Sequence, residues 1–183
     1  MGSGLKRWSQ SYRRNNMAKE PELVIRKAVA TDAEAVLNLL TILKTESTTF
    51  EDSSDDVDSA TESEQIKQIS MSTQQVILLA VRDDELVGLV TILPTADSST
   101  GEIGVAVLKQ YWHHGIGREL MLTALDWAAL SSSFQVISLT VQLRNKHAVK
   151  LYEDIGFQTV RTTQVTTSTG EVVEASEMQL AVK

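Results

Sequence analysis

The stretch VLKQYWHHGIGRELM, residues 107–121, sets two histidines directly before a Gly-Ile-Gly sequence and then continues with the apolar spacing of a helix. A strand that ends in a glycine turn and opens a helix is an anion site, because the first helical N–H groups lack intrahelical partners and the helix dipole adds positive charge there. Gly115 and Gly117 would let a phosphate approach the backbone closely. The stretch therefore indicates a phosphate site, a catalytic histidine pair, or a plain turn that enters a helix.

The histidines themselves do not form a metal-site pattern. His113 and His114 are adjacent, and adjacent side chains rarely converge on one ion. His147 opens a later expected helix and should face solvent. The chain has no cysteine, which removes disulfides, thiolate zinc sites and a cysteine nucleophile. We therefore expect no metal, and we interpret all three histidines as non-catalytic.

Apolar residues recur with the period of a strand or of a helix along the chain, in the order strand, helix, helix, three strands, helix, strand, helix, two strands. The strands are expected at residues 23–27, 76–82, 85–93, 102–108, 136–143, 159–167 and 172–182. The helices are expected after Thr31-Asp32, at residues 62–71, from Gly115 onward, and from Asn145 to a C-cap at Gly156. This order indicates a mixed α/β sheet with helices on its faces.

Two of the expected helices have a clear apolar face. The first should bury Ala33, Val36, Leu37, Leu40 and Leu43. The helix after Gly115 should bury Ile116, Leu120, Met121, Ala124, Leu125 and Ala128. The consecutive apolar residues of the strands at 76–82 and 85–93 indicate a hairpin that is covered on both faces.

Common phosphate motifs are absent: there is no GxxxxGK[ST], and no GxGxxG follows the first expected strand. Instead, residues 22–183 resemble the GNAT superfamily of acetyl-CoA-dependent N-acetyltransferases. In that family the fourth strand runs into (Q/R)-x-x-G-x-(G/A), which WHHGIG at residues 112–117 matches except that Trp112 replaces Gln or Arg. A second block, N-x-x-A-x-x-L-Y-E-x-x-G-F, is matched by residues 145–157. The opening IRKAVATDAEAVLNLL is similar to the family's first strand and helix.

The resemblance implies a GNAT-like α/β fold, with a mixed, twisted sheet of about six to seven strands that is splayed where the coenzyme inserts, and helices on both faces. It implies acetyl-CoA as co-substrate, with the pantetheine arm on the backbone around Val107, where an N–H would polarise the acetyl carbonyl. The pyrophosphate would lie on residues 113–119. These are His113, His114, Gly115, Ile116, Gly117, Arg118 and Glu119, with the histidines adding at most partial positive charge.

The same resemblance assigns roles to three further residues. Asn145 would hydrogen-bond the pantetheine region, although its side chain suits a helix N-cap equally well. Tyr152 would be the general acid, because a phenol with a pKa of about 10 can hydrogen-bond or protonate a sulfur whose thiol pKa is about 8.5; the alternative is a tyrosine packed in the core. Glu102 is a candidate base for the incoming ammonium, directly or through water; the alternatives are a surface glutamate and a substrate that enters uncharged.

Charge is distributed unevenly along the chain. Of the 17 Lys and Arg residues, four lie in residues 1–16 with no acid, which leaves 13 basic against 24 acidic residues, a net charge of −11, in residues 17–183. Such an acidic body argues against binding to nucleic acid. We interpret residues 1–16 as a disordered basic extension, upstream of a natural start at Met17 or added for expression; the alternative is a functional arm that binds an anionic surface. Residues 17–183 then form a single N-acetyltransferase domain.

The run FEDSSDDVDSATESE, residues 50–64, holds seven acids and predicts a solvated loop, with attraction of a cationic amine as the alternative. The longest apolar runs are far shorter than the ~20 residues that cross a bilayer, so we expect no membrane span and a cytoplasmic protein.

The expected reaction is direct transfer of acetyl from acetyl-CoA to a primary amine of a small molecule or of a peptide or protein N-terminus. The alternative is a non-catalytic acyl-CoA-binding or sensor module. The resemblance also allows a homodimer, formed through the sheet or its C-terminal hairpin.

Overall fold

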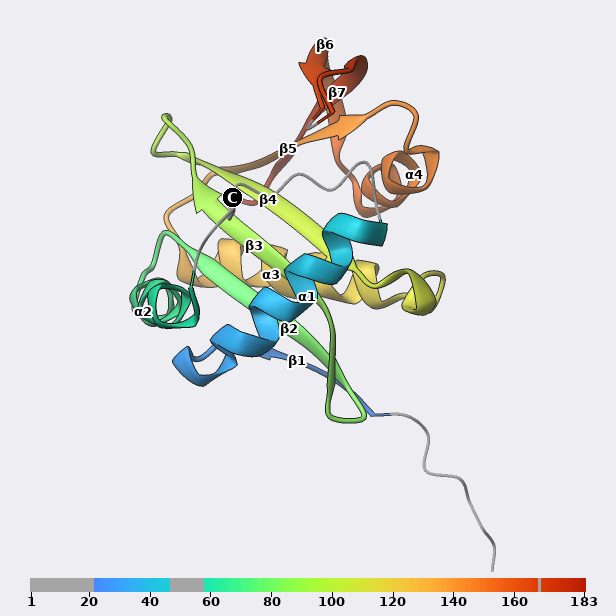
Figure 1. The fold of residues 1–183 in the computed structure, drawn as a ribbon. Coiled ribbons are helices and arrows are strands. Elements are labelled where there is room, and N and C mark those ends of the chain that lie inside the picture. Colours follow the sequence, from blue (N-terminus) through green and yellow to red (C-terminus); the bar gives the residue numbers. More distant parts are fainter. Residues whose placement is uncertain (1–21, 47–57, 168) are drawn as a thin grey trace, which may run out of the picture.

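The computed structural model describes residues 22–46, 58–167 and 169–183 (Figure 1). Their strands form one seven-stranded sheet. The strands are β1 (Leu23–Lys27), β2 (Val76–Arg82), β3 (Glu85–Pro94), β4 (Thr100–Val107), β5 (Val136–Gln142), β6 (Gln158–Thr166) and β7 (Val172–Ala181). The helices are α1 (Ala33–Glu46), α2 (Ser59–Ser70), α3 (Ile116–Ser131) and α4 (Lys146–Ile155), with short 3-10 turns η1 (Ala30–Asp32) and η2 (Lys109–Tyr111). The predicted order of elements is confirmed.

The sheet has the strand order β1-β2-β3-β4-β5-β7-β6, and only β4 and β5 run parallel to each other. β1 to β4 form an antiparallel meander. Its central hairpin turns at Asp83 and Asp84, whose φ angles of 50° and 67° are left-handed. Two such residues in succession match the twist of the flanking strands, so this short acidic turn fixes the register of β2 against β3.

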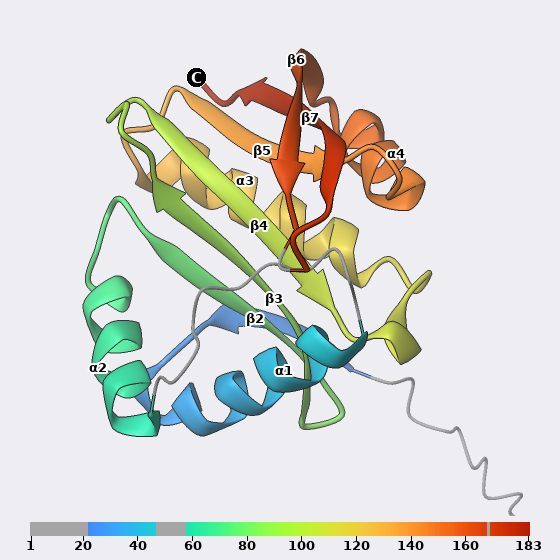
Figure 2. The ribbon, with the colours of Figure 1, turned by 45° about the horizontal axis from the view of Figure 1, so that its top comes forward.

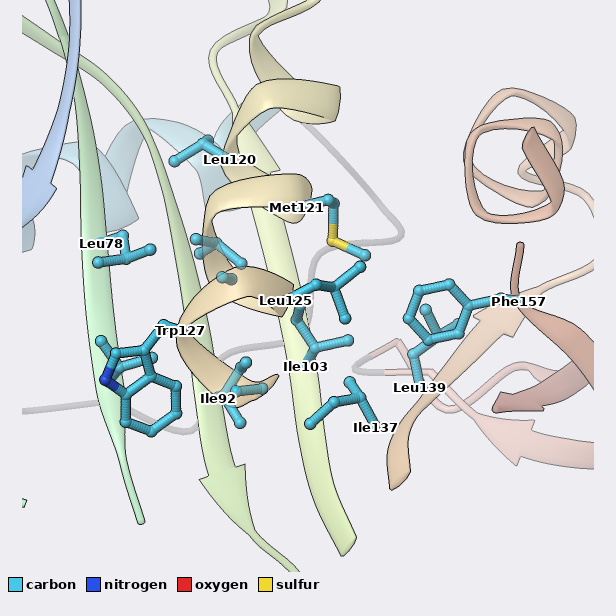
Figure 3. Packing of buried hydrophobic residues seen from close by; sticks show 14 of the residues in the cluster. Leu78, Ile92, Ile103, Leu120, Met121, Leu125, Trp127, Ile137, Leu139 and Phe157 are labelled. Carbon is cyan, nitrogen blue, oxygen red and sulfur yellow. The ribbon is translucent and has the colours of Figure 1, made fainter. Parts of the chain in front are cut away.

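Helices cover both faces of the sheet, as predicted. α1 and α2 lie on one face, and α3 and α4 lie on the other (Figures 1 and 2). All six predicted core residues of α3 are buried, and Trp127 joins them. Figure 3 shows Met121 and Leu125 directed toward Leu139 and Phe157, so α3 fills the space between the first strands and the C-terminal half of the chain.

The predicted apolar face of α1 was wrong in part. Leu39 is buried, whereas Leu37 and Leu40 are only half-buried. Position 39 lies between Val36 and Leu43 on the helix surface, because residues three and four apart stack on the same face. Leu37 falls at the edge of that stripe.

The acidic run at residues 50–64 does not remain a loop throughout. α2 begins at Ser59, after an N-cap in which the Asp58 carboxylate accepts from the Thr61 N–H at 2.7 Å. The last residues of the run are therefore helical, because an aspartate that accepts an amide hydrogen at this position stabilises a helix start. The part of the run before residue 58 lies outside the described residues, as does the basic extension at residues 1–16.

The sheet is nearly divided in two between β4 and β5. Their ladder joins only Thr100–Glu102 with Val136–Ser138. Beyond it, β4 continues against β3 as far as Val107, while β5 continues against β7 as far as Gln142. Figure 2 shows the carboxyl ends of the two strands pointing apart. The expected splay is present at this point.

Within the part of the chain that the structure describes, no helix is long and apolar enough to cross a membrane.

Candidate functional site

The carboxyl end of β4 exposes backbone groups on the side of the splay. Leu108 donates its N–H to the Val87 carbonyl at 2.9 Å, toward β3. Because successive residues of an antiparallel strand direct these groups to opposite sides, Val105 and Val107 direct theirs away from β3, where pairing to β5 has already ended. We call the N–H and C=O groups of Val105 and Val107 the open edge of β4. An extended ligand could pair with them.

α3 is the next helix after this edge, beyond the short turn η2, and its first amide groups have no partner within the helix. Gly115 is its N-cap, with a left-handed φ of 80°, and a Cβ there would meet nothing within 4 Å. Glycine is favoured for its backbone conformation and not for lack of space. The first intrahelical bond is donated by Glu119 to Gly115 at 3.0 Å, so the N–H groups of residues 116–118 have no partner within the helix. Together with the helix dipole they suit a phosphate.

Gly117 lies close to two neighbouring elements, and its expected role toward a phosphate stays a prediction. A Cβ on Gly117 would lie 3.7 Å from Leu151 Cδ2 and 3.9 Å from Val107 Cγ2. This residue therefore lies where β4, α3 and α4 converge. A Cβ at this position would point toward these neighbouring elements, and both distances are ordinary van der Waals contacts.

Trp112, which departs from the family motif, makes a defined contact. Its indole Nε1 donates to the Val107 carbonyl at 2.7 Å, and 41% of the residue is exposed. His114 Nδ1 lies 2.8 Å from the Trp112 carbonyl oxygen. An indole can donate only through this one N–H, so Trp112 occupies one group of the open edge. Sequence spacing gave no signal for this contact.

The histidines stand around the same turn. His113 has a left-handed φ of 64°, which is uncommon for a residue with a side chain. The centroid of its ring lies 4.4 Å from that of His147, and the two ring planes are 80° apart. The turn before α3 therefore contacts the start of α4. His147 is exposed, as expected, and its ring also contacts that of His113. Among the described residues, no group of three or more His, Cys, Asp or Glu side chains could hold a metal ion.

Asn145 caps α4. Its Oδ1 accepts from the Ala148 N–H at 3.2 Å, which confirms the structural role that the sequence allowed. This contact uses the carbonyl half of the side-chain amide. A further role toward the coenzyme stays a prediction.

The cap and the coenzyme role can be separated by substitution. Asn145→Ala should lower the free energy of unfolding by about 1 kcal/mol, because an unpaired amide is left at the helix start. Asn145→Asp keeps the acceptor and should retain most of that stability. Urea unfolding measures the first role, and calorimetric titration of CoA measures the second. If Asn145→Asp binds CoA as tightly as the unsubstituted protein, the residue acts as a cap alone.

Tyr152 combines a packed ring with an unpaired hydroxyl. Its ring lies against the core of the α3 face and meets Phe157 with the ring centroids 6.0 Å apart. The hydroxyl makes no hydrogen bond to a described residue. Among the described residues, no side-chain polar atom is both fully buried and without a hydrogen bond, so the Tyr152 oxygen is accessible to solvent. Burial raises the pKa of Tyr152 to about 12. The side chain is thus held neutral, as a hydrogen-bond donor.

Glu102 is exposed on β4, at the end where β4 and β5 are still paired. It lies five residues from Val107, roughly 16 Å along the strand. Side chains alternate between the faces of a strand, so Glu102 shares the face of Ala106, which packs toward α1. The structure therefore does not bring Glu102 next to Tyr152, and any action on the amine would need a water or a long substrate.

An open pocket of about 390 Å³ lies beside the start of α4. It is lined by Leu143, Arg144, Lys146, Glu171, Val173 and Glu174. Arg144 pairs with Glu171 at 2.8 Å, whereas Glu174 is exposed. This pocket borders the carboxyl end of β5, on the far side of the splay from the open edge.

Comparison with known proteins gives a consistent result. The model of the acetyltransferase (GNAT) family matches residues 38–157. An acetyltransferase of the GNAT family from Streptococcus pneumoniae is 27% identical, covers 87% of this chain and 99% of its own, and superposes with a TM-score of 0.81. Curated proteins yield no significant match.

Two more distant structures share the fold. A protein of Salmonella typhimurium, solved with its cofactor acetyl-CoA, is 17% identical, with 88% of this chain and 95% of its own covered and a TM-score of 0.77. A ribosomal-protein-alanine N-acetyltransferase from Brucella melitensis is 20% identical, and the match covers 86% of this chain and 99% of its own, with a TM-score of 0.76.

Proposed function

The chain belongs to the acetyltransferase (GNAT) family, and from this premise we propose that it transfers acetyl directly from acetyl-CoA to a primary amine. The observation that carries the proposal is the open edge of β4 followed, after η2 and the turn before Gly115, by the N-terminal amide groups of α3. One element offers alternating donors and acceptors to an amide-containing arm, and the next offers N–H groups and a positive dipole to a diphosphate. CoA has these two parts in this order.

The residues present fit the coenzyme. Val105 and Val107 would hold the pantetheine arm, and the amides of residues 116–118 would hold the diphosphate. Arg118 places a positive charge in the first turn of α3, beside the negative charge of Glu119, and both side chains are exposed. The coenzyme would supply an acetyl group activated as a thioester. The Val107 N–H would polarise its carbonyl oxygen.

Tyr152 would stabilise the departing sulfur. With a pKa of about 12, the phenol stays protonated and gives the sulfur a hydrogen bond, since full proton transfer to a group with a pKa of about 8.5 would be uphill. The amine must lose a proton before or during attack. We propose two ways in which this proton is lost. Glu102 removes it through a water molecule, or the enzyme binds the minor fraction of amine that is already neutral.

The defining experiment combines binding and turnover. Calorimetry should detect CoA, and incubation of acetyl-CoA with a pooled amine and peptide library should release free thiol and give a product that mass spectrometry identifies. CoA binding without thiol release from any amine would favour the alternative, a non-catalytic acyl-CoA-binding module. Absence of CoA binding would contradict both.

The pH dependence follows from the raised pKa of Tyr152. The donor form of the phenol should persist to about pH 11, one unit below its pKa. kcat should therefore rise or level off between pH 7 and about pH 10.5 as the amine loses its proton, without a falling limb from this residue. The measurement is kcat against pH, with protein integrity checked at each point. A falling limb with a pKa near 10 that disappears in Tyr152→Phe would contradict this assignment.

The acceptor is a small amine or a peptide or protein N-terminus in our proposal. The neighbour from Brucella melitensis is named for alanine of a ribosomal protein, yet one fold hosts many acceptors. The acidic body of the chain favours a cationic acceptor. Steering by residues 50–64, a cytoplasmic location and a homodimer stay predictions.

A further inference from the structure

The indole of Trp112 lies on a group that the coenzyme would need. Val107 directs its carbonyl away from β3, along the open edge, and Trp112 Nε1 donates to it at 2.7 Å. The proposed function places the pantetheine arm on this edge. A carbonyl oxygen has a second lone pair, but an indole bonded at this distance also brings its fused rings against the strand end. An arm could not lie alongside the same group while the rings remain there.

The indole is free to leave, whereas its neighbour is held. Tyr111 donates its hydroxyl to Glu85 at 2.7 Å, and Arg82 lies over its ring at 5.6 Å from the centroid. The ring of Tyr111 also packs against both buried clusters, so this residue holds η2 to the hairpin of β2 and β3 even without its hydroxyl bond. Trp112 is 41% exposed and is not part of either buried cluster. A rotation of its side chain would therefore clear the strand end without unfolding the turn that leads to Gly115.

We propose that Trp112 competes with the coenzyme: its indole N–H occupies the Val107 carbonyl in the free protein, and the pantetheine arm displaces it on binding. This inference rests on the proposed function. The free energy of the lost indole bond is subtracted from that of coenzyme binding, so Trp112 lowers the affinity for CoA. Trp112 acts only on coenzyme binding and takes no part in the acetyl transfer itself.

Trp112→Phe tests the competition, because it keeps an aromatic ring and removes the only donor. A net hydrogen bond of ordinary strength corresponds to an affinity for CoA about 3- to 10-fold tighter in this variant. The matched control is Tyr111→Phe, which also deletes one aromatic donor but one that points to Glu85. Its dissociation constant for CoA should stay within about twofold of that of the unsubstituted protein. Calorimetry gives both values, and circular dichroism confirms that both variants are folded.

A second measurement follows the indole directly. The chain has three tryptophans, so protein labelled with 5-fluorotryptophan gives three fluorine resonances, and the one missing from Trp112→Phe belongs to Trp112. Titration with 4′-phosphopantetheine, which has the arm but no adenine ring, should shift this resonance toward that of a solvent-exposed indole. An unshifted resonance under saturating phosphopantetheine would overturn the proposal, as would equal or weaker CoA binding by Trp112→Phe. If the unsubstituted protein bound neither compound, the proposed function itself would fail.

Discussion

Replacement of Tyr152 by phenylalanine should lower kcat for acetyl transfer by about 100-fold, while the dissociation constant for CoA stays within about twofold. The substitution removes only the hydroxyl, which makes no hydrogen bond to a described residue. The ring would keep its place against Phe157, so the free energy of unfolding should change little. Steady-state kinetics, CoA calorimetry and urea unfolding together separate loss of chemistry from loss of structure.

Tyr111→Phe is again the matched control, because it makes the same chemical change at a phenol that is already bonded to Glu85. Its kcat should remain within about threefold of that of the unsubstituted protein, since the hydroxyl lies outside the site. If Tyr152→Phe retained full kcat, the hydroxyl would have no part in the departure of the sulfur. Tyr152 would then be a packing residue, as the alternative interpretation of the sequence holds.

Gly88→Ala should weaken CoA binding by about 10-fold or more and lower the free energy of unfolding by about 1–3 kcal/mol. Gly88 is buried in β3, directly opposite Val107. A Cβ there would lie 2.8 Å from the Ala106 carbonyl oxygen and 3.3 Å from Val107 Cα. Both are backbone atoms of β4, which cannot rotate away as a side chain could. The strand end, and with it the open edge, would have to shift.

Gly104→Ala provides the comparison for stability in the same ladder. The nearest atom to a Cβ at Gly104 is Thr91 Oγ1 at 3.5 Å, which is an ordinary contact. Its free energy of unfolding should change by less than about 1 kcal/mol. Urea unfolding of both variants and CoA calorimetry of Gly88→Ala measure the two effects. Equal stability of the two variants would show that β4 accommodates the added methyl without displacement.

The sequence predicted the elements well, because most of them are defined by local patterns. Strict apolar spacing placed α3 and its buried face, and Asn145 and Gly156 marked the ends of α4. Ends differed by a residue or two, and a longer difference arose at Ser59, where a single capping aspartate extended α2 into an acidic run. The family motifs added the splay, which no periodicity reveals.

The side-chain contacts of the site could not be predicted in the same way. The bond from Trp112 to Val107 depends on how a five-residue turn closes, and the contact of His113 with His147 joins segments that are distant in sequence. The separation of Glu102 from Tyr152 likewise follows from strand length and from the alternation of faces. Spacing along the chain identifies which residues are present at a site, but their mutual orientation is set by tertiary packing.

The short ladder between β4 and β5 also bears on aggregation. An unpaired strand edge is normally a template on which another chain can add a strand, and proteins blunt such edges at the rim of a sheet. Here the free edge lies in the interior of the sheet order, with β3 behind it, β5 diverging in front, and α3 and α4 along one face. A second protein chain would need to enter this wedge lengthwise to pair with it. The fold thereby keeps the edge, of which Trp112 occupies one carbonyl, available to a slender ligand while withholding it from other copies of the chain.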